Sequence, residues 1–276
     1  MSIWFAIFLG FIQGLTEFLP VSSSGHLAIF QNFFGMEDPG SYMLFNVLLH
    51  LATLFAVCIF FWQDIKSMVL EFFRFFNPKS YRSVRVPPAR RLLLLVIVGT
   101  LPLLIFAFFS ETVKLLSGKP LFIGIALTAT GGLLWLSDML PKGNKDEKSA
   151  TLLDVIYVGF MQGIATIPGL SRSGLTISTG MFRGFDRRFA VKLSFLMSVP
   201  AILGATVLEV GEAFASDFDW TALPVYLAGM VTAAVTGYLA LCFIRLLAAK
   251  GSFRVFAYYC LFVGVATLLA SLIMSP

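Results

Sequence analysis

Two polar segments interrupt an otherwise apolar chain, and they carry the side chains best suited to chemistry. The first, QGLTEFLPVSSSGH, covers residues 13–26, and the second, QGIATIPGLSRSGLT, covers residues 162–176. Each segment places an ionisable side chain in an apolar region, Glu17 in the first and Arg172 in the second. An ionisable residue inside a membrane segment is costly, so both segments are candidate functional sites.

An internal repeat relates the two segments. They align without a gap, and the aligned pairs include the identities Gln13/Gln162, Gly14/Gly163, Ser22/Ser171, Ser24/Ser173 and Gly25/Gly174. Two related segments of this kind predict one composite site to which each contributes different side chains.

The small and hydroxyl-bearing residues of both segments predict an anion site. Turns rich in glycine and serine expose backbone N–H groups, and helix N-termini attract anions. Arg172 adds a planar fork of donors that matches two phosphate oxygens. Pro20 and Pro168 are expected to end the incoming half-helices. The ligand expected is phosphate or pyrophosphate, bound by Ser22, Ser24, Gly25, Ser171, Ser173, Gly174 and Thr176.

Glu17 would repel a phosphate group, which predicts a divalent cation between the two. Gln13 and Glu17 are four residues apart and so share one face of a helix. Their oxygens suit Mg²⁺ or Ca²⁺. Ser23 and His26 lie three residues apart across a turn, so a hydroxyl nucleophile with an imidazole base is the expected catalytic pair.

Less specific roles are open for several of these side chains. Arg172 would also serve as a structural counter-ion for Glu17, and His26 would also serve by bonding a backbone carbonyl. One or two of the serines 22–24 are expected to cap the second helix of their segment. His50 lies in a separate apolar stretch and is expected to pack there or to bond between helices.

The composition places the chain in a membrane. Of its 276 residues 58% are apolar and 13% are charged, and the mean hydropathy is +0.88. Soluble domains carry about 25% charged residues, so the sequence predicts an all-α polytopic membrane protein with a single membrane domain over residues 1–276. The positive-inside rule explains the net charge of +5, and no nucleic-acid partner is expected. We expect no cleaved signal peptide, and Cys58, Cys242 and Cys260 read as small core residues.

Apolar stretches long enough to span a bilayer set the expected topology. A spanning helix needs about 20 mostly apolar residues. Six stretches qualify: 42–62, 92–110, 121–140, 193–211, 223–247 and 254–274. Two further regions, 3–34 and 153–182, are broken by Pro, Gly and Ser into halves too short to span, so both are predicted to be re-entrant helical hairpins.

The distribution of charge predicts the orientation. Of the 20 Lys and Arg residues, 17 fall in the connections 63–91, 141–150, 183–192 and 245–254, whereas the opposite connections are mostly acidic, with Glu37, Asp38, Glu111, Glu212, Asp217 and Asp219. Basic connections lie in the cytoplasm, which places both termini outside and requires region 153–182 to enter and leave at one face. Each repeat, 1–140 and 151–276, then holds one hairpin and three spans in inverted topology, with the hairpin tips meeting near the midplane.

These motifs resemble those of the bacterial undecaprenyl-diphosphatase family, also called the bacitracin-resistance family. That family has an (E/Q)xxxE motif followed by PVSSxGH, and a second motif PGxSRSxxT. They correspond here to Gln13–Glu17, Pro20–His26 and Pro168–Thr176. Length, spans and repeat agree, so the resemblance covers the whole chain. This chain has Gln13 where many relatives have Glu at the first metal-type position.

The resemblance implies a hydrolase that converts undecaprenyl pyrophosphate to undecaprenyl phosphate and inorganic phosphate, recycling the lipid carrier of cell-wall synthesis. It implies a divalent-metal requirement, with Gln13 and Glu17 as ligands, and catalysis by Glu17, Ser23, His26 and Arg172. It also implies a bacterial cytoplasmic (inner) membrane location, with the site open to the outer, periplasmic face and the polyprenyl tail of the substrate among helices and lipid.

Alternatives remain at two levels. The nucleophile is Ser23, with His26 as base, or His26 itself, or a metal-activated water. A polyprenyl-phosphate flippase is the competing function, alone or beside hydrolysis, because inverted repeats with broken helices are also the architecture of transporters. An anion channel fits poorly, since Glu17 would oppose anion passage. A homo-oligomer is compatible with the sequence.

Overall fold

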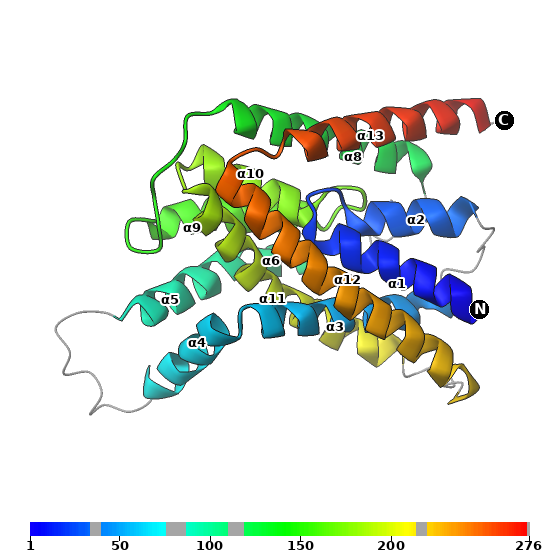
Figure 1. The fold of residues 1–276 in the computed structure, drawn as a ribbon, viewed down its shortest axis with the longest axis horizontal. Helices are drawn as coiled ribbons and strands as arrows, with labels where there is room; N and C mark the ends of the chain where they lie inside the picture. Colours follow the sequence, from blue (N-terminus) through cyan, green and yellow to red (C-terminus); the bar gives the residue numbers. More distant parts are fainter. Residues whose placement is uncertain (34–39, 76–86, 110–118, 214–219, 275–276) are drawn as a thin grey trace.

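A computed structural model describes residues 1–33, 40–75, 87–109, 119–213 and 220–274. In this described part the chain is helical, and its only β contact is an isolated bridge between Lys145 and Phe185. Figure 1 shows the helices packed as one bundle, with many of them roughly aligned. The all-α class predicted from composition is confirmed.

Two helix–break–helix units match the predicted hairpins. The first consists of α1 (Ile3–Phe18) and α2 (Ser23–Phe33), and the second of α9 (Leu152–Ile164) and α10 (Arg172–Phe182). Each break contains a proline, which cannot continue the helix hydrogen bonding. In the second break Gly169 has φ +89°, a left-handed conformation that suits glycine.

Five helical stretches are long and apolar enough to cross a membrane, as expected for a multi-pass protein. Four are single helices: α8 (Pro120–Met139), α11 (Arg187–Ala213), α12 (Leu223–Lys250) and α13 (Arg254–Met274). The fifth, Pro88–Ala107, contains α5 (Pro88–Thr100) and α6 (Leu103–Ala107). A short 3₁₀ helix, η2 (Trp220–Ala222), precedes α12.

The connection expected over residues 63–91 begins with a helix, which the sequence analysis missed. Helix α3 (Gly40–Phe60) is followed at once by α4 (Trp62–Phe75), and the pair is bent by 87°. Charged residues hold α4 to its neighbours, because Lys192 Nζ lies 2.7 Å from Asp64 Oδ1 and Arg90 Nε lies 3.0 Å from Glu71 Oε2. Helix α3 covers most of the predicted 42–62 span.

The packing of the helices follows the predicted repeat. Helix α1 packs on α12, and its counterpart α9 packs on α5. Both contacts depend on facing glycines: a methyl group at Gly10 would overlap the Gly229 carbonyl, and a methyl group at Gly159 would overlap the Gly99 carbonyl. Such small residues let helix backbones approach closely. The two halves therefore share a mode of packing as well as a motif.

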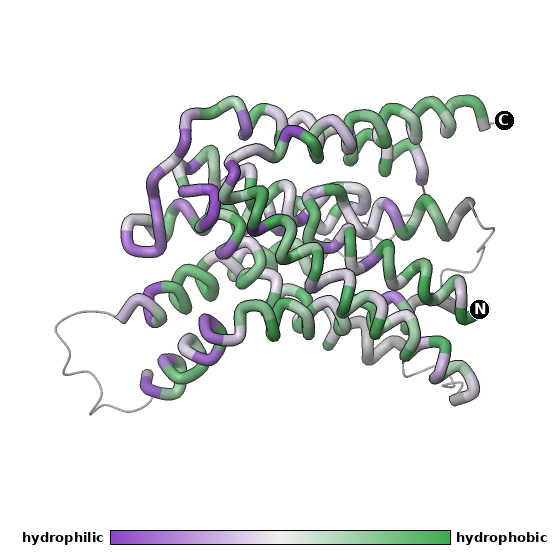
Figure 2. Tube along the Cα trace, in the orientation of Figure 1, coloured by the Kyte–Doolittle hydropathy of each residue, from purple (hydrophilic) through white to green (hydrophobic). Residues whose placement is uncertain are grey.

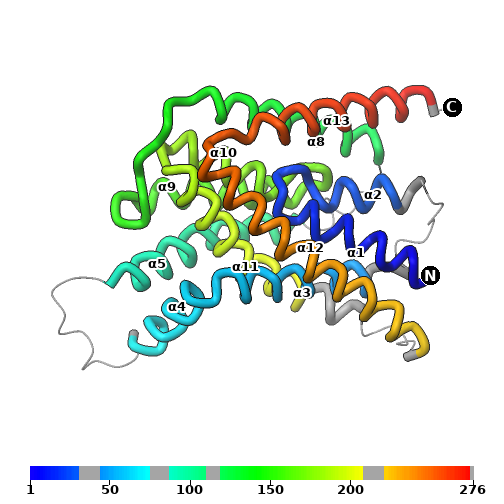
Figure 3. Tube along the Cα trace, in the orientation of Figure 1, coloured from blue at the N-terminus to red at the C-terminus, as the bar shows by residue number. Residues whose placement is uncertain are grey.

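Hydrophilic residues gather at one end of the bundle. Figure 2 shows them around the 141–150 connection and the adjoining helix ends, away from both termini, whose positions Figure 3 shows. This is the end where the predicted basic connections meet. Three of its predicted basic residues, Lys79, Arg82 and Arg85, fall outside the described residues, as do Glu37, Asp38, Glu111, Asp217 and Asp219 of the opposite connections.

Candidate active site

The tips of the two hairpins touch. The Ser173 hydroxyl donates a hydrogen bond of 3.2 Å to the Leu19 carbonyl, which joins the second break to the first. A Cβ at Gly25 would lie 3.1 Å from Gly169 Cα, a tight contact, so the two glycines favour this close approach of the breaks. The two breaks therefore meet at one junction, as the predicted composite site requires.

The same serine cap begins the second helix of each hairpin. Ser22 Oγ accepts a hydrogen bond of 3.2 Å from Gly25 N, and Ser171 Oγ accepts one of 3.1 Å from Gly174 N. These are the side-chain contacts of N-cap residues. The expectation that one of the three consecutive serines caps α2 is confirmed for Ser22, which has φ +71°. The N-termini of α2 and α10 thus both lie at the junction.

Glu17 is the hub of the polar side chains there. Its buried carboxylate accepts a hydrogen bond of 2.7 Å from Ser23 Oγ and one of 3.1 Å from Gln13 Nε2. The Arg172 guanidinium donates to Glu17 Oε1 through Nη2. The sequence placed the carboxylate and the guanidinium on different halves, and the structure joins them in an ion pair.

Arg172 keeps one donor group unused. Its Nη1 is buried and has no hydrogen-bond partner within the described protein. A purely structural counter-ion for Glu17 would not require a second buried donor without an acceptor, because an unsatisfied buried polar group costs about 1–3 kcal/mol. Nη1 is the group that a phosphate oxygen would satisfy.

His26 is held by two contacts, neither of them to Ser23. Its Nδ1 lies 2.8 Å from the Ser22 carbonyl oxygen, and its Nε2 lies 2.7 Å from the hydroxyl of Tyr259 on α13. A carbonyl only accepts, so Nδ1 carries the proton and Nε2 accepts from Tyr259. The predicted Ser23–His26 pair is not formed, because the imidazole turns back onto its own helix while Ser23 reaches across to Glu17.

The predicted phosphate-binding serines and threonine differ in exposure. Ser24 is exposed, whereas Ser22, Ser171, Ser173 and Thr176 are buried. The hydroxyls of the second hairpin contact protein groups: Ser171 Oγ lies 3.2 Å from Ser173 Oγ, and Thr176 Oγ1 lies 2.6 Å from Ser194 Oγ. Thr176 also donates to the Arg172 carbonyl at 2.8 Å.

Comparison with known proteins agrees with the two motifs. The family described as bacitracin resistance protein BacA matches residues 6–266. This chain belongs to that family. Proteins named undecaprenyl-diphosphatase are among its relatives. The one from Desulforapulum autotrophicum is 38% identical over 99% of this chain and 100% of its own length, and the one from Alkaliphilus metalliredigens is 40% identical with the same coverage. The protein of that name from Methanobrevibacter smithii is 39% identical over 99% of both chains.

Two residues outside the motifs reach this site. His50 was expected to pack or to bond between helices, and the second expectation is confirmed, because its Nδ1 lies 3.0 Å from Gln13 Nε2 and 3.6 Å from Glu17 Oε2. Tyr259 was not singled out, and its ring stacks on His26 with centroids 5.6 Å apart. Both lie in apolar helices remote in sequence from the motifs, and a polar residue in such a helix is the only signal that the sequence offers.

Glu17 and Gln13 are the side chains at the junction whose oxygens could hold a divalent cation. Gln13 Oε1 is buried and has no hydrogen-bond partner within the described protein, and it belongs to the side chain that contacts the Glu17 carboxylate. No cluster of three or more His, Cys, Asp or Glu residues that would hold a metal unaided occurs in the described residues. Mg²⁺ is commonly bound by one or two carboxylates together with substrate phosphates and water. Glu17 with Gln13 fits this pattern.

Proposed function

We propose that this chain hydrolyses undecaprenyl pyrophosphate to undecaprenyl phosphate and inorganic phosphate. The buried, unpartnered Nη1 of Arg172, on the guanidinium that pairs with Glu17, is the observation that supports this role most directly. The names of the full-length relatives point to the same substrate. Dephosphorylation would recycle the lipid carrier used in cell-wall synthesis.

In the proposed membrane arrangement, six spans accompany two re-entrant hairpins in one domain. The spans are α3 with α4, α5 with α6, α8, α11, α12 and α13, and the hairpins are α1–α2 and α9–α10. Helices α1 and α9 are 16 and 13 residues long, too short to cross about 30 Å of hydrocarbon. Residues 1–140 and 151–276 form the inverted repeats. The protein is placed in the inner membrane, with the site open to the periplasmic face.

Ser23 is the proposed nucleophile, because its hydroxyl already donates to a carboxylate. Ser23 Oγ attacks the terminal phosphorus, the Oγ–P bond forms, and the bond from phosphorus to the bridging oxygen breaks. The Ser23 proton passes to Glu17, 2.7 Å away, and undecaprenyl phosphate leaves. Water then hydrolyses the phosphoserine and releases phosphate, restoring the serine.

Arg172 and the two helix N-termini would bind the pyrophosphate. The guanidinium supplies Nη1, and α2 and α10 each begin at the junction with backbone N–H groups that suit anions. His26 is the base proposed for the hydrolytic second step. Its Nε2 would take the proton of the attacking water once the Tyr259 hydroxyl gives up its hydrogen bond to that nitrogen, while the bond from Nδ1 to the Ser22 carbonyl keeps the orientation of the ring.

The proposed divalent cation, Mg²⁺ or Ca²⁺, would be held by Glu17 and Gln13. When bound it would neutralise charge on the pyrophosphate oxygens. His50 lies beside both residues and is placed to orient the Gln13 amide, since its Nδ1 accepts from Gln13 Nε2 at 3.0 Å.

Phosphate release by detergent-solubilised protein given a polyprenyl pyrophosphate and Mg²⁺ or Ca²⁺ tests the function. Without a membrane barrier, release reports hydrolysis alone, and its absence would remove the proposal. No observation favours lipid flipping as a second function.

Trapping identifies the nucleophile. Quenching a reaction with terminally labelled substrate and mapping the label by mass spectrometry should place it on Ser23. A label on His26, or on no residue, would replace Ser23 by the imidazole or by water.

A further inference from the structure

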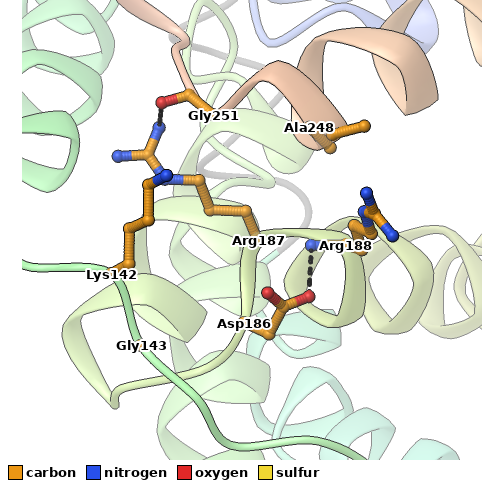
Figure 4. Close-up of a pocket in the computed structure, with 8 residues that line it drawn as sticks. Lys142, Gly143, Asp186, Arg187, Arg188, Ala248 and Gly251 are labelled. Atoms are coloured by element: carbon orange, nitrogen blue, oxygen red, sulfur yellow. Dashed lines mark hydrogen bonds between the residues drawn. The ribbon is translucent and has the colours of Figure 1, made fainter.

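A polar cavity lies at the basic end of the molecule. It has a volume of about 210 Å³ and is lined by residues of three segments: the 141–150 connection, the start of α11 and the end of α12. Figure 4 shows Lys142, Arg187 and Arg188 around it. None of its lining residues belongs to either hairpin break, so the cavity is separate from the proposed active site.

Arg187 forms the buried wall of this cavity. The residue is 8% exposed, and its Nη1 donates to Asp138 and to the Gly251 carbonyl. Asp138 also accepts from Arg254 Nε at 3.1 Å and from Phe253 N at 3.1 Å. These contacts fix the guanidinium, yet its Nε is buried with no hydrogen-bond partner within the described protein.

Two further cations line the cavity without a carboxylate partner. In the described part of the chain, neither Lys142 nor Arg188 makes a side-chain hydrogen bond or ion pair. Lys142 Nζ lies 3.9 Å from the position of a Cβ on Gly251, the residue whose carbonyl accepts from Arg187. The side chains of Lys142 and Arg187 therefore both lie beside Gly251.

The one carboxylate in the lining is already used. Asp186 Oδ1 accepts from Arg188 N at 2.9 Å and from Phe189 N at 3.3 Å, which caps the first turn of α11. Arg187 is paired with Asp138, but Lys142 and Arg188 face only the Asp186 carboxylate, so the lining keeps an excess of positive charge, and Arg187 Nε lacks an acceptor.

We propose that this cavity binds a phosphate-bearing anion. A tetrahedral anion with several oxygens would accept from Arg187 Nε and neutralise Lys142 and Arg188 together. A liquid water molecule occupies about 30 Å³, so the cavity holds a phosphate group but no polyprenyl chain. The ligand is either inorganic phosphate or the headgroup of an anionic lipid in the leaflet at the basic face. Basic pockets at the cytoplasmic side suit such headgroups.

The test uses two matched variants in the full-length protein. Lys142→Gln removes a cation from the cavity, and Lys148→Gln removes one from the same connection outside it. Both lysines are exposed, so both variants should fold. The measurements are made in an Arg172→Ala background, which keeps phosphate binding at the proposed active site from contributing.

Two probes distinguish the sources of phosphate. Inorganic phosphate is titrated at constant ionic strength while thermal unfolding is followed, and phosphatidylglycerol retention is counted by native mass spectrometry against phosphatidylcholine. At least one probe should bind the background protein and the Lys148→Gln variant, and should bind the Lys142→Gln variant at least fivefold more weakly. Binding of phosphate alone identifies the free anion, and binding of the lipid identifies the headgroup.

Equal binding to both variants, or binding of neither probe, would overturn the proposal. Hydrolase activity is measured separately in the otherwise unmodified protein, where Lys142→Gln should retain the activity of Lys148→Gln. The inference does not rest on the proposed hydrolysis, because its readout is binding at a different site.

Discussion

The two hairpins begin and turn alike but differ at the positions between their caps. Ser22 and Ser171 cap their helices through the same atoms, with a glycine three residues later in each case. At the next aligned position, however, the first hairpin has Ser23 and the second has Arg172, and these two side chains meet on one carboxylate, that of Glu17. Two hairpins with the same serine caps therefore contribute two different side chains to the same carboxylate.

The second hairpin is also anchored more firmly where it begins. Helix α1 starts with a serine cap, in which Phe5 N donates to Ser2 Oγ at 3.3 Å. Its counterpart α9 starts with a reciprocal capping box between Thr151 and Asp154, and Asp154 also binds Lys145 and Arg183. The hairpin that carries Arg172 thus begins with a capping box and two ion pairs, whereas the hairpin that carries Ser23 begins with a serine cap.

Of the variants in the two hairpins, those at Ser23 should lose the most activity. Ser23→Ala removes the proposed nucleophile and is expected to lower kcat by more than about 10³-fold. Ser24→Ala, one residue further and exposed, should stay within about tenfold of wild type. Initial rates of phosphate release measure both, with thermal unfolding as the check on folding. Comparable activity in the two variants would show that Ser23 has no special role.

Replacing Arg172 tests the other half. Arg172→Ala should lower kcat/KM by about 10²- to 10³-fold, the cost of one preorganised donor to a developing anion. Arg172→Lys should recover little, since an ammonium lacks the fork that reaches Glu17 and a phosphate oxygen together. Near-normal rates in Arg172→Lys would reduce Arg172 to a counter-ion.

Removing the Tyr259 hydroxyl tests how the first hairpin holds its base. Tyr259→Phe deletes the hydrogen bond to His26 Nε2 and should lower kcat by about tenfold, the equivalent of about 1.4 kcal/mol. KM should change little, and the pH–rate profile should shift because the titrating imidazole has lost a partner. Tyr258→Phe is the neighbouring control. An unchanged profile would make Tyr259 a packing residue.

The aligned glutamines should respond in opposite ways. Gln13 contacts Glu17 and His50, whereas both polar atoms of Gln162 are buried without a partner within the described protein. Gln162→Leu should therefore retain activity and unfold at the same or a higher temperature, because an unsatisfied buried amide costs about 1–3 kcal/mol. Gln13→Leu should lose activity and raise the metal concentration needed for half-maximal rate. Equal losses would place Gln162 in the site.

Lowering the pH should reduce the stability of the fold by protonating Asp154 at the start of the second hairpin. Burial opposes ionisation of this carboxyl, but the hydrogen bonds from Thr151, Lys145 and Arg183 outweigh it and lower its pKa from 3.8 to about 2. A lowered pKa stabilises the fold above pH 4, and this stabilisation is lost as pH falls from about 4 to about 2. The contribution is about 1–2 kcal/mol after screening of the partly exposed Lys145 and Arg183.

Thermal unfolding of solubilised wild type and Asp154→Asn between pH 2 and pH 6 measures this contribution. The variant should be less stable near pH 6, and the difference should vanish towards pH 2. A difference that does not depend on pH would assign the effect to packing. Ser2→Ala at the start of α1 should show a small loss with no such pH dependence.

The sequence by itself determined the class, the repeat and the local structure of the breaks. Apolar length and charge distribution specify membrane helices, and a proline followed by a capping serine specifies where each hairpin turns, because these effects act within a few residues. The involvement of Glu17, Ser23 and Arg172 followed from their chemical types in an apolar setting.

Only the tertiary structure decided which side chains meet. Ser23 bonds Glu17 and not His26, His50 joins Gln13, and Tyr259 reaches His26 from the other end of the chain. Such contacts depend on the register between helices packed at glycine pairs, which residue spacing does not encode. The cationic cavity at the basic end was missed for the same reason, because it is lined by segments distant in sequence. Helix α4 was missed although its apolar residues already recur at helical spacing.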